Sequence, residues 1–137
     1  MKLLDTSVVV DIDRGGVDDR VTKLDAEGRH AISAVTATEL RLGVEKRYED
    51  DTAEYRTAID GLDRLLARFE LVPISRSVAT AAARIIHGLR RDGNSLNDLH
   101  DVYIGATART EQVPVLTGNV SHFSRIDDLD VVDWADY

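Results

Sequence analysis

A carboxylate and two hydroxyls stand together near the start of the chain, where a short buried strand is expected to end. Asp5 follows the apolar run at residues 2–4, and Thr6 and Ser7 come directly after it. A carboxylate at the end of a buried parallel strand lies at the carboxyl edge of the sheet, where such folds bind their ligands. Asp, Thr and Ser also cap helices well. Capping is therefore the alternative for Asp5, although it explains one of the three residues better than all three.

A second carboxylate, Glu39, lies on a helical pattern together with small and apolar residues. Thr36, Glu39, Leu40 and Gly43 are spaced at i, i+3, i+4 and i+7, so they share one face of the predicted helix. A carboxylate on such a face is tolerated only if its desolvation is compensated, and a bound cation would do this. The alternative is a helix rotated by one position, which leaves Glu39 in solvent.

A third carboxylate, Asp101, shows the same pattern further along the chain. Asp101, Ile104, Gly105 and Ala108 form one stripe, so Asp101 is expected to face inward with small neighbours that let the helix approach the sheet closely. Asp98 lies one turn earlier, near the start of the predicted helix. There it is as well placed to cap the helix or interact with its dipole as to contact a metal ion.

Two neutral oxygen-bearing residues follow another apolar run. Thr117 ends the run at 115–117, and Asn119 comes two residues later, after a glycine. Both side chains are candidate metal ligands or partners of a metal-bound water at the same sheet edge. Taken alone, they are equally typical of an ordinary turn.

These oxygen-rich candidates favour a hard cation and hydrolysis of phosphodiester bonds. Mg²⁺ and Mn²⁺ prefer oxygen ligands, and several carboxylates in one pocket repel each other unless cations intervene. Two ions about 4 Å apart can activate a water and stabilise the leaving oxygen of an in-line displacement at phosphorus. The chain has no cysteine and four scattered histidines, at 30, 87, 100 and 122, which argues against zinc and against histidine acid–base catalysis. His100 and His122, close to the candidates, are interpreted as structural or as partners of the metal ligands.

The elements that must position these residues alternate between strands and helices. Buried strands are predicted at 2–4, 31–33, 71–74 and 115–117, with a possible edge strand at 131–132. Helices are predicted at 7–13, 17–27, 35–48, 52–69, 77–91, 98–110 and 120–124. Ser33 or Thr36 is expected to cap the third helix, and Gly93 to stop the fifth. The alternation predicts one α/β domain over 1–137, with a parallel sheet of about five strands and helices on both faces.

The charge of the chain opposes nucleic-acid binding except at a local site. The net charge is −8, with 18 Asp, 3 Lys and 14 Arg, and such a surface repels nucleic acid at long range. An RNA site must therefore depend on metal ions and a few arginines. The candidate phosphate contacts, for which ion pairs or solvated helix faces are the alternative, are Arg41, Arg84, Arg90, Arg91 and Arg109.

Composition also bears on the environment of the protein. An Asp-rich, Lys-poor chain is typical of proteins from very salty cytoplasm, although an ordinary acidic protein is an equal alternative. No signal peptide is recognised, and no apolar run approaches the roughly 20 residues of a membrane-spanning helix. Without cysteine there is no disulfide framework. These observations predict a cytoplasmic protein without a membrane segment.

Four short motifs in this order resemble those of a known family. They are Leu-Asp-Thr-Ser at 4–7, Thr-x-x-Glu-Leu-x-x-Gly at 36–43, Asp-x-x-Ile-Gly-Ala at 101–106 and Leu-Thr-Gly-Asn-Val-x-His-Phe at 116–123. Each alone is weak, but together they resemble the PIN-domain ribonucleases, and most of all the VapC toxins of VapBC toxin–antitoxin pairs. The resemblance extends over essentially the whole chain, including a closing apolar and aromatic segment at 131–134.

The resemblance implies a five-stranded parallel sheet and Mg²⁺- or Mn²⁺-dependent endoribonuclease activity on single-stranded or loop RNA. It also implies a homodimer and inhibition by a cognate VapB-type antitoxin, whose C-terminal segment threads the active-site groove. Asp5, Glu39 and Asp101 match the acidic metal ligands of the family. Asn119 stands where many relatives have a fourth Asp, which leaves open whether one or two ions bind and whether Asp98 substitutes. The side chains expected to support these ligands are Thr6, Ser7, Thr36 and Thr117.

Other classes of protein place acidic residues at the same edge of a sheet. A phosphate-accepting receiver domain would need an acidic pair after the first strand and a lysine near the last, whereas Asp5 stands alone and no lysine follows Lys46. A non-catalytic PIN-like binding module would usually have lost one of the three acids, and all three are present. A PIN-domain nuclease of RNA processing is the remaining alternative to a toxin.

Overall fold

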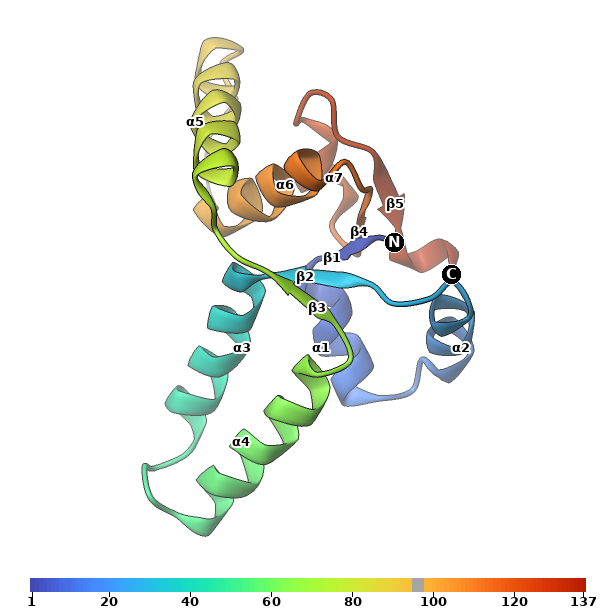
Figure 1. The fold of residues 1–137 in the computed structure, drawn as a ribbon, viewed down its shortest axis with the longest axis vertical. Helices are drawn as coiled ribbons and strands as arrows, with labels where there is room; N and C mark the ends of the chain where they lie inside the picture. The colour runs from blue at the N-terminus through green and yellow to red at the C-terminus, as the bar shows by residue number, and fades with distance from the viewer. Residues whose placement is uncertain (95–97) are drawn as a thin grey trace.

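The computed structural model describes residues 1–94 and 98–137 and contains a five-stranded, all-parallel sheet (Figure 1). The strand order is β3-β2-β1-β4-β5, and every neighbouring pair is parallel. The strands are β1 (Leu3–Leu4), β2 (Ala31–Ser33), β3 (Glu70–Val72), β4 (Val115–Thr117) and β5 (Val131–Asp133). The predicted α/β class and the five parallel strands are confirmed.

Seven α-helices and one 3₁₀ helix connect or follow these strands in the described residues. They are α1 (Thr6–Arg14), α2 (Asp18–Ala26), α3 (Ala34–Arg47), α4 (Ala53–Leu66), α5 (Arg76–Arg91), α6 (Leu99–Glu111), α7 (Val120–Ser124) and η1 (Trp134–Asp136). No helix within the described part of the chain is both long and apolar enough to cross a membrane.

The two faces of the sheet carry separate apolar cores, because successive strand residues point to opposite sides. Leu3 packs on one face with residues of α5 and α6, while Leu4 packs on the other with residues of α1 and α2. Both leucines are fully buried. Helices therefore cover both faces, as predicted, and the carboxyl ends of the strands remain available between the two helical layers.

The strand predictions are most accurate in the centre of the sheet and least accurate at its edge. β2 and β4 have the predicted bounds, whereas β3 covers 70–72 instead of 71–74. Leu71 and Ile74 are exposed, so this run is not a fully buried strand. The physical reason is that β3 lies at the edge of the sheet, and that Pro73, which has no N–H to donate, ends the strand.

The helix ends show which polar residues act as caps. Ser33 caps α3, its side chain accepting a hydrogen bond from the Val35 N–H. Thr36, the other predicted cap, lies inside the helix and is fully buried. Gly93 follows α5 with φ of +76°, as expected for a glycine that ends a helix.

The two ends of the chain lie close together (Figure 1) and are joined through Glu27, which follows α2. Glu27 accepts hydrogen bonds from the Lys2 ammonium and from the Tyr137 hydroxyl. These donors lower the pKa of Glu27, the Lys2 hydrogen bond most strongly. The three side chains fix β1, α2 and the end of the chain relative to one another.

Replacing this carboxylate, Glu27→Gln, is expected to destabilise the fold at neutral pH by about 0.5–1 kcal/mol, the size of an exposed ion pair or neutral hydrogen bond. Because the folded pKa of Glu27 is below its unfolded value, its contribution is present above the unfolded pKa and is lost as the pH falls through the folded pKa. Denaturant unfolding should therefore show a difference from wild type at pH 7 that shrinks toward pH 3. The exposed loop residue Glu49 supplies the control, Glu49→Gln. A difference that grows on acidification would contradict this role of Glu27.

Candidate metal centre

The first predicted ligand, Asp5, is held by three donors at the carboxyl end of β1. Its Oδ1 accepts a hydrogen bond from the Thr6 N–H at 2.8 Å. Its Oδ2 accepts hydrogen bonds from the hydroxyls of Ser7 and Thr117, both at 2.8 Å. The side chain caps α1 and is 4% exposed. Asp5 is thus both an N-cap and a fixed carboxylate, and the hydroxyls of Ser7 and Thr117 contact it directly.

The turn after β4 joins this arrangement through its backbone. The Asn119 N–H donates to Thr117 Oγ1 at 2.9 Å, and the Gly118 N–H donates to Ser7 Oγ at 3.3 Å. Asn119 precedes α7, but its side chain does not cap that helix. The Asn119 side chain is exposed and therefore remains a candidate ligand at this edge.

The second predicted ligand, Glu39, is connected to β1 by a hydroxyl. Thr6 Oγ1 donates to Glu39 Oε1 at 2.7 Å and lies 3.0 Å from the hydroxyl of Thr36. The Glu39 side chain is 27% exposed, so the alternative of a freely solvated carboxylate is wrong. Gly43, however, is exposed, and the predicted inward stripe therefore does not extend to it. Since Leu40 still packs on the core, α3 turns away from the sheet beyond that residue.

The third predicted ligand, Asp101, is buried in the first turn of α6. It is 8% exposed, and its Oδ2 accepts a hydrogen bond from His122 Nδ1 at 2.8 Å. Burial raises the pKa of Asp101, the hydrogen bond from His122 opposes this rise, and the negative charges of Asp98 and Asp5 add to it. Asp101 therefore lies within the electrostatic field of Asp5 and Asp98, and a cation at this position would relieve the repulsion.

The stripe that follows Asp101 is buried as predicted, and its glycine also contacts a segment beyond the sheet. Ile104, Gly105 and Ala108 are all buried in α6. A Cβ added at Gly105 would lie 2.7 Å from Ile126 Cδ1, in the segment between α7 and β5. The missing side chain therefore makes room for that segment, while α6 also lies close to the central strands β1, β2 and β4, as predicted.

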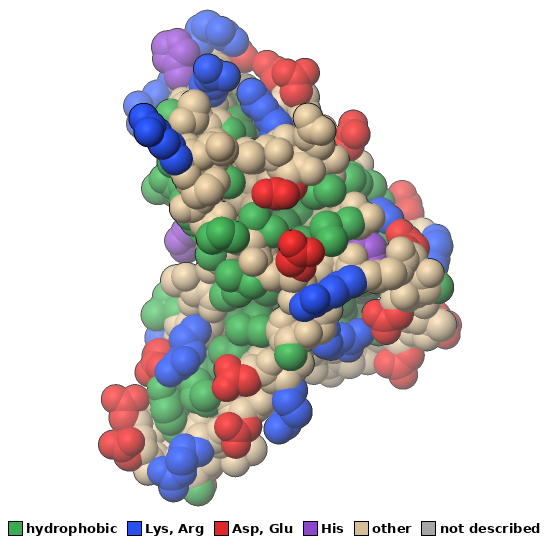
Figure 2. All heavy atoms as spheres, viewed as in Figure 1, with side chains coloured by type: hydrophobic (Ala, Val, Ile, Leu, Met, Phe, Trp, Pro, Cys, Tyr) green, Lys and Arg blue, Asp and Glu red, His purple; other side chains and the backbone are tan. Residues whose placement is uncertain are grey.

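Asp98 acts as a cap, which was one of its two predicted roles. Its Oδ1 accepts a hydrogen bond from the His100 N–H at 2.9 Å, and its side chain is 46% exposed. His100 Nδ1 lies 3.4 Å from Glu39 Oε2 and 3.9 Å from Asp98 Oδ1. His100 thus joins α6 to α3. On the surface, this face of the molecule is indented between the part formed by α5 and α6 and the part formed by α3 and α4 (Figure 2).

The acidic residues are neighbours, but they do not form a compact ligand set by direct contact. Thr6 connects the strand of Asp5 to Glu39, and electrostatic coupling connects Asp5 to Asp101. Within residues 1–94 and 98–137, no group of three Asp, Glu or His side chains is close enough to hold a metal ion. The donors here are carboxylate and hydroxyl oxygens, which fit Mg²⁺ or Mn²⁺. A shared ion therefore needs side-chain rotation or bridging waters, of which Mg²⁺ usually keeps several.

Some contacts of this centre are not evident from the sequence pattern. His122 and Asp101 lie 21 residues apart, and only the packing of α7 beside α6 shows that they pair. The five arginine candidates differ in their surroundings. Arg41 pairs with Glu45, and Arg91 with Asp92, which is the ion-pair alternative. Arg84 and Arg109 line a hollow between α5 and α6, to which sequence patterns gave no guide.

Comparison with known proteins identifies the family and the solved structures that this chain resembles. The sequence model described as "PIN domain" matches residues 2–129. A protein named Ribonuclease VapC from Rickettsia bellii is 31% identical over 132 residues, covering 95% of this chain and 93% of that protein. The crystal structure of FitAcB from Neisseria gonorrhoeae matches with a TM-score of 0.82 and 28% identity, covering all of both chains. The structure of VapBC-5 from Mycobacterium tuberculosis, a member of the VapBC family of toxin–antitoxin systems, matches with a TM-score of 0.68 and 26% identity, covering 96% of this chain and 95% of that one.

Proposed function

Because this chain belongs to the PIN-domain family and is of the VapC type, we propose that it is a Mg²⁺- or Mn²⁺-dependent endoribonuclease, the toxin of a type II toxin–antitoxin pair. The observation that supports this proposal is the linkage of the three carboxylates near the carboxyl edge of the sheet, where Thr6, next to Asp5, donates a hydrogen bond to Glu39 and the charge of Asp5 acts on Asp101. Each comes from a different part of the chain, and each is held by a specific neighbour. A ribonuclease name is carried by a relative that covers 95% of this chain.

The three carboxylates are the residues that would hold the ion. When bound, the ion supplies Lewis-acid chemistry that favours attack of water on a phosphodiester. Asp5 has both carboxylate oxygens oriented by the Thr6 N–H and by the hydroxyls of Ser7 and Thr117. The remaining lone pairs of these oxygens can still bind a cation. Asp5 is therefore the fixed point of the centre, around which the other two ligands adjust.

Glu39 and Asp101 are less constrained than Asp5, because each accepts a hydrogen bond shorter than 3 Å on only one oxygen. Thr6 holds Glu39 Oε1, and His122 holds Asp101 Oδ2. Hydrogen bonds of this kind fix the orientation of a ligand and tune its affinity for metal. In this reading His122 is a positioning residue, and His100 does the same for the other oxygen of Glu39.

Cleavage of RNA by the purified chain tests this proposal. End-labelled single-stranded RNA should be cut internally in Mg²⁺ or Mn²⁺, and EDTA in excess of the metal should stop the reaction. Fragments that appear equally fast in EDTA would contradict metal dependence. The absence of cleavage across a panel of RNAs of different sequence would contradict a nuclease and favour a binding module.

As a toxin, the chain has a VapB-type antitoxin as its partner and cleaves RNA in the cytoplasm. One solved structure similar to this chain is a VapBC toxin–antitoxin system. The proposal predicts a small open reading frame beside this gene whose product binds the chain and blocks cleavage. A nuclease of RNA processing would lack that neighbour. The homodimer implied by the resemblance stays a prediction, which the mass of the purified chain in light scattering tests.

A further inference from the structure

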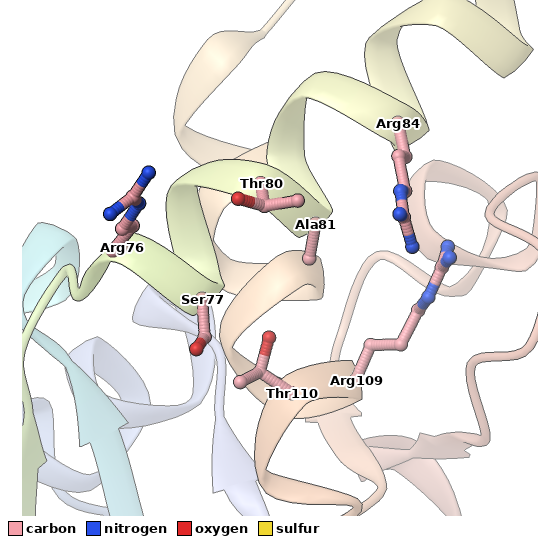
Figure 3. A pocket seen from close by; sticks show the side chains of 7 residues that line it. All are labelled: Arg76, Ser77, Thr80, Ala81, Arg84, Arg109 and Thr110. Atoms are coloured by element: carbon pink, nitrogen blue, oxygen red, sulfur yellow. The ribbon is translucent and has the colours of Figure 1, made fainter.

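A pocket lined by arginines lies between α5 and α6 (Figure 3), and none of the acidic side chains described above lines it. Its volume is about 430 Å³. It is named here the arginine pocket and is lined by Arg76, Ser77, Thr80, Ala81, Arg84, Arg109 and Thr110. Lys and Arg side chains also gather over α5 in the space-filling view (Figure 2). The pocket is thus a local positive region on a chain of net charge −8.

The arginines of this pocket form no ion pair with a carboxylate in the described part of the chain. Neither Arg76 nor Arg84 forms a hydrogen bond or ion pair with a residue in the described part of the chain, and Arg109 donates only to the backbone oxygen of Asp127, at 3.3 Å. The side chains of Arg84 and Arg109 point toward one another across the pocket (Figure 3). Like charges directed at one space repel unless an anion lies between them.

A neighbouring hollow differs from the arginine pocket in the charges of its lining residues. It has a volume of about 300 Å³ and shares Arg84 and Arg109 with the arginine pocket, but its lining also includes three carboxylates, those of Asp92, Asp127 and Asp128. The arginine pocket has no carboxylate in its lining. The side of these two guanidinium groups that faces the arginine pocket is therefore the side without a lining carboxylate.

The donors of this pocket match phosphate in number and type. A guanidinium presents a planar set of N–H donors that binds two phosphate oxygens at once. Arg84 and Arg109 direct two such groups toward one another at one end of the pocket, Arg76 lies at the other end, and the hydroxyl residues Ser77, Thr80 and Thr110 also line it (Figure 3). Since the overall field of this acidic chain repels polyanions, binding here must come from direct contacts, which is what this arrangement provides.

We propose that the arginine pocket binds backbone phosphates of the RNA substrate, on either side of the nucleotide that is cut. Arg109 follows Asp101 by eight residues on the same helix, α6. At the rise of an α-helix, this separation is about 12 Å along the axis. One RNA strand can therefore reach both places. This proposal rests on the proposed ribonuclease function, and it adds a substrate-binding site outside the metal centre.

Binding of labelled single-stranded RNA to the double variant Arg76→Gln/Arg84→Gln tests this site. Fluorescence anisotropy is measured in EDTA, so that no cleavage takes place. The matched control is Arg14→Gln/Arg64→Gln. It removes the same two charges from exposed positions on α1 and α4 that do not line the pocket. Both variants have a net charge of −10, from −8 − 2, so any difference between them is local.

The pocket variant should bind RNA about tenfold more weakly than the control at low salt. Its slope of log affinity against log salt should be smaller by about 1.4, from about 0.7 for each lost contact with a single strand. Equal affinities and slopes in the two variants would overturn the RNA site. Calorimetry with inorganic phosphate is the second arm. Phosphate binding that the pocket variant loses while its RNA affinity equals the control would assign the pocket to a free phosphate compound and also overturn it.

The outcome is separable from that of the proposed function. RNA cleavage by wild type in Mn²⁺ tests the nuclease and does not depend on the arginine pocket. If wild type cleaves RNA and the two double variants bind it equally, the nuclease stands and only the second site is wrong. If wild type neither cleaves nor binds RNA, both are wrong.

Discussion

Replacing Asp101 by asparagine is expected to reduce RNA cleavage by roughly 100- to 1,000-fold, the usual loss when one preorganised electrostatic group is removed from a reacting centre. Asparagine has the same shape and can still accept the hydrogen bond from His122, but it lacks the negative charge that a cation requires. The initial rate of cleavage of a labelled RNA in Mn²⁺ measures the effect. The exposed α4 residue Asp60 supplies the control, Asp60→Asn, which should cleave at the wild-type rate.

The fold of this variant should be intact, which separates lost chemistry from lost structure. Burial and the charges of Asp5 and Asp98 raise the pKa of Asp101, so its ionised form is disfavoured in the folded chain. Removing the charge should therefore leave the melting temperature in EDTA unchanged or higher. Cleavage at the wild-type rate by Asp101→Asn would show that Asp101 is only a structural residue and would remove the main support for the nuclease.

Adding Mn²⁺ to the metal-free chain is expected to raise its melting temperature substantially. An ion that binds only the assembled centre stabilises the fold by about 2.7 kcal/mol at 100 times its Kd. For a chain of this length, that corresponds to a rise of roughly 10 °C. Differential scanning fluorimetry with and without millimolar Mn²⁺ measures the shift.

The variant Asp5→Asn should lose most of this shift, because it removes the carboxylate around which the centre is built. Asp60→Asn should keep the shift, which excludes diffuse attraction of Mn²⁺ to an acidic surface as its source. A melting temperature that does not respond to Mn²⁺ would indicate that Asp5, with its three hydrogen-bond donors, serves only to cap α1.

Local patterns predicted much of the fold because local physics determines it. The alternation of short apolar runs and helical stripes predicted four parallel strands and a possible fifth at the edge, and β2 and β4 have the predicted bounds. The edge strand β3 was less well predicted, since one side of it has no neighbour to bury Leu71. The helical periodicity also predicted that Gly43 faces inward, whereas Gly43 is exposed because α3 has left the core at that point.

The carboxylates of the centre could be recognised from strand ends and helix stripes, but their partners could not. Asp5 has its donors next to it in sequence, apart from Thr117, which lies 112 residues away. The pairing of His122 with Asp101 and the close approach of Ile126 to Gly105 depend on how the segment from α7 to β5 packs beside α6. Such contacts arise from tertiary packing, which a one-dimensional pattern does not encode.

The surroundings of the arginines could not be predicted from the sequence pattern either. Five arginines were predicted to be candidate phosphate contacts. In the structure they differ in whether a carboxylate lies beside them. Arg41 has a carboxylate partner four residues away on its own helix. Arg84 has no such partner in the described residues, and it meets Arg109 only because α5 packs on α6. Arg76, outside the predicted group, completes the pocket.

The position of a bound Mn²⁺ ion is the most direct test of a shared cation. Crystals of the chain grown with Mn²⁺ and measured for anomalous scattering should show a peak about 2–3 Å from an oxygen of Asp5 and of Asp101. Glu39 should bind the ion directly or through one water. A peak elsewhere on the surface, with Asp5 and Asp101 still bound only to their protein donors, would contradict the metal centre.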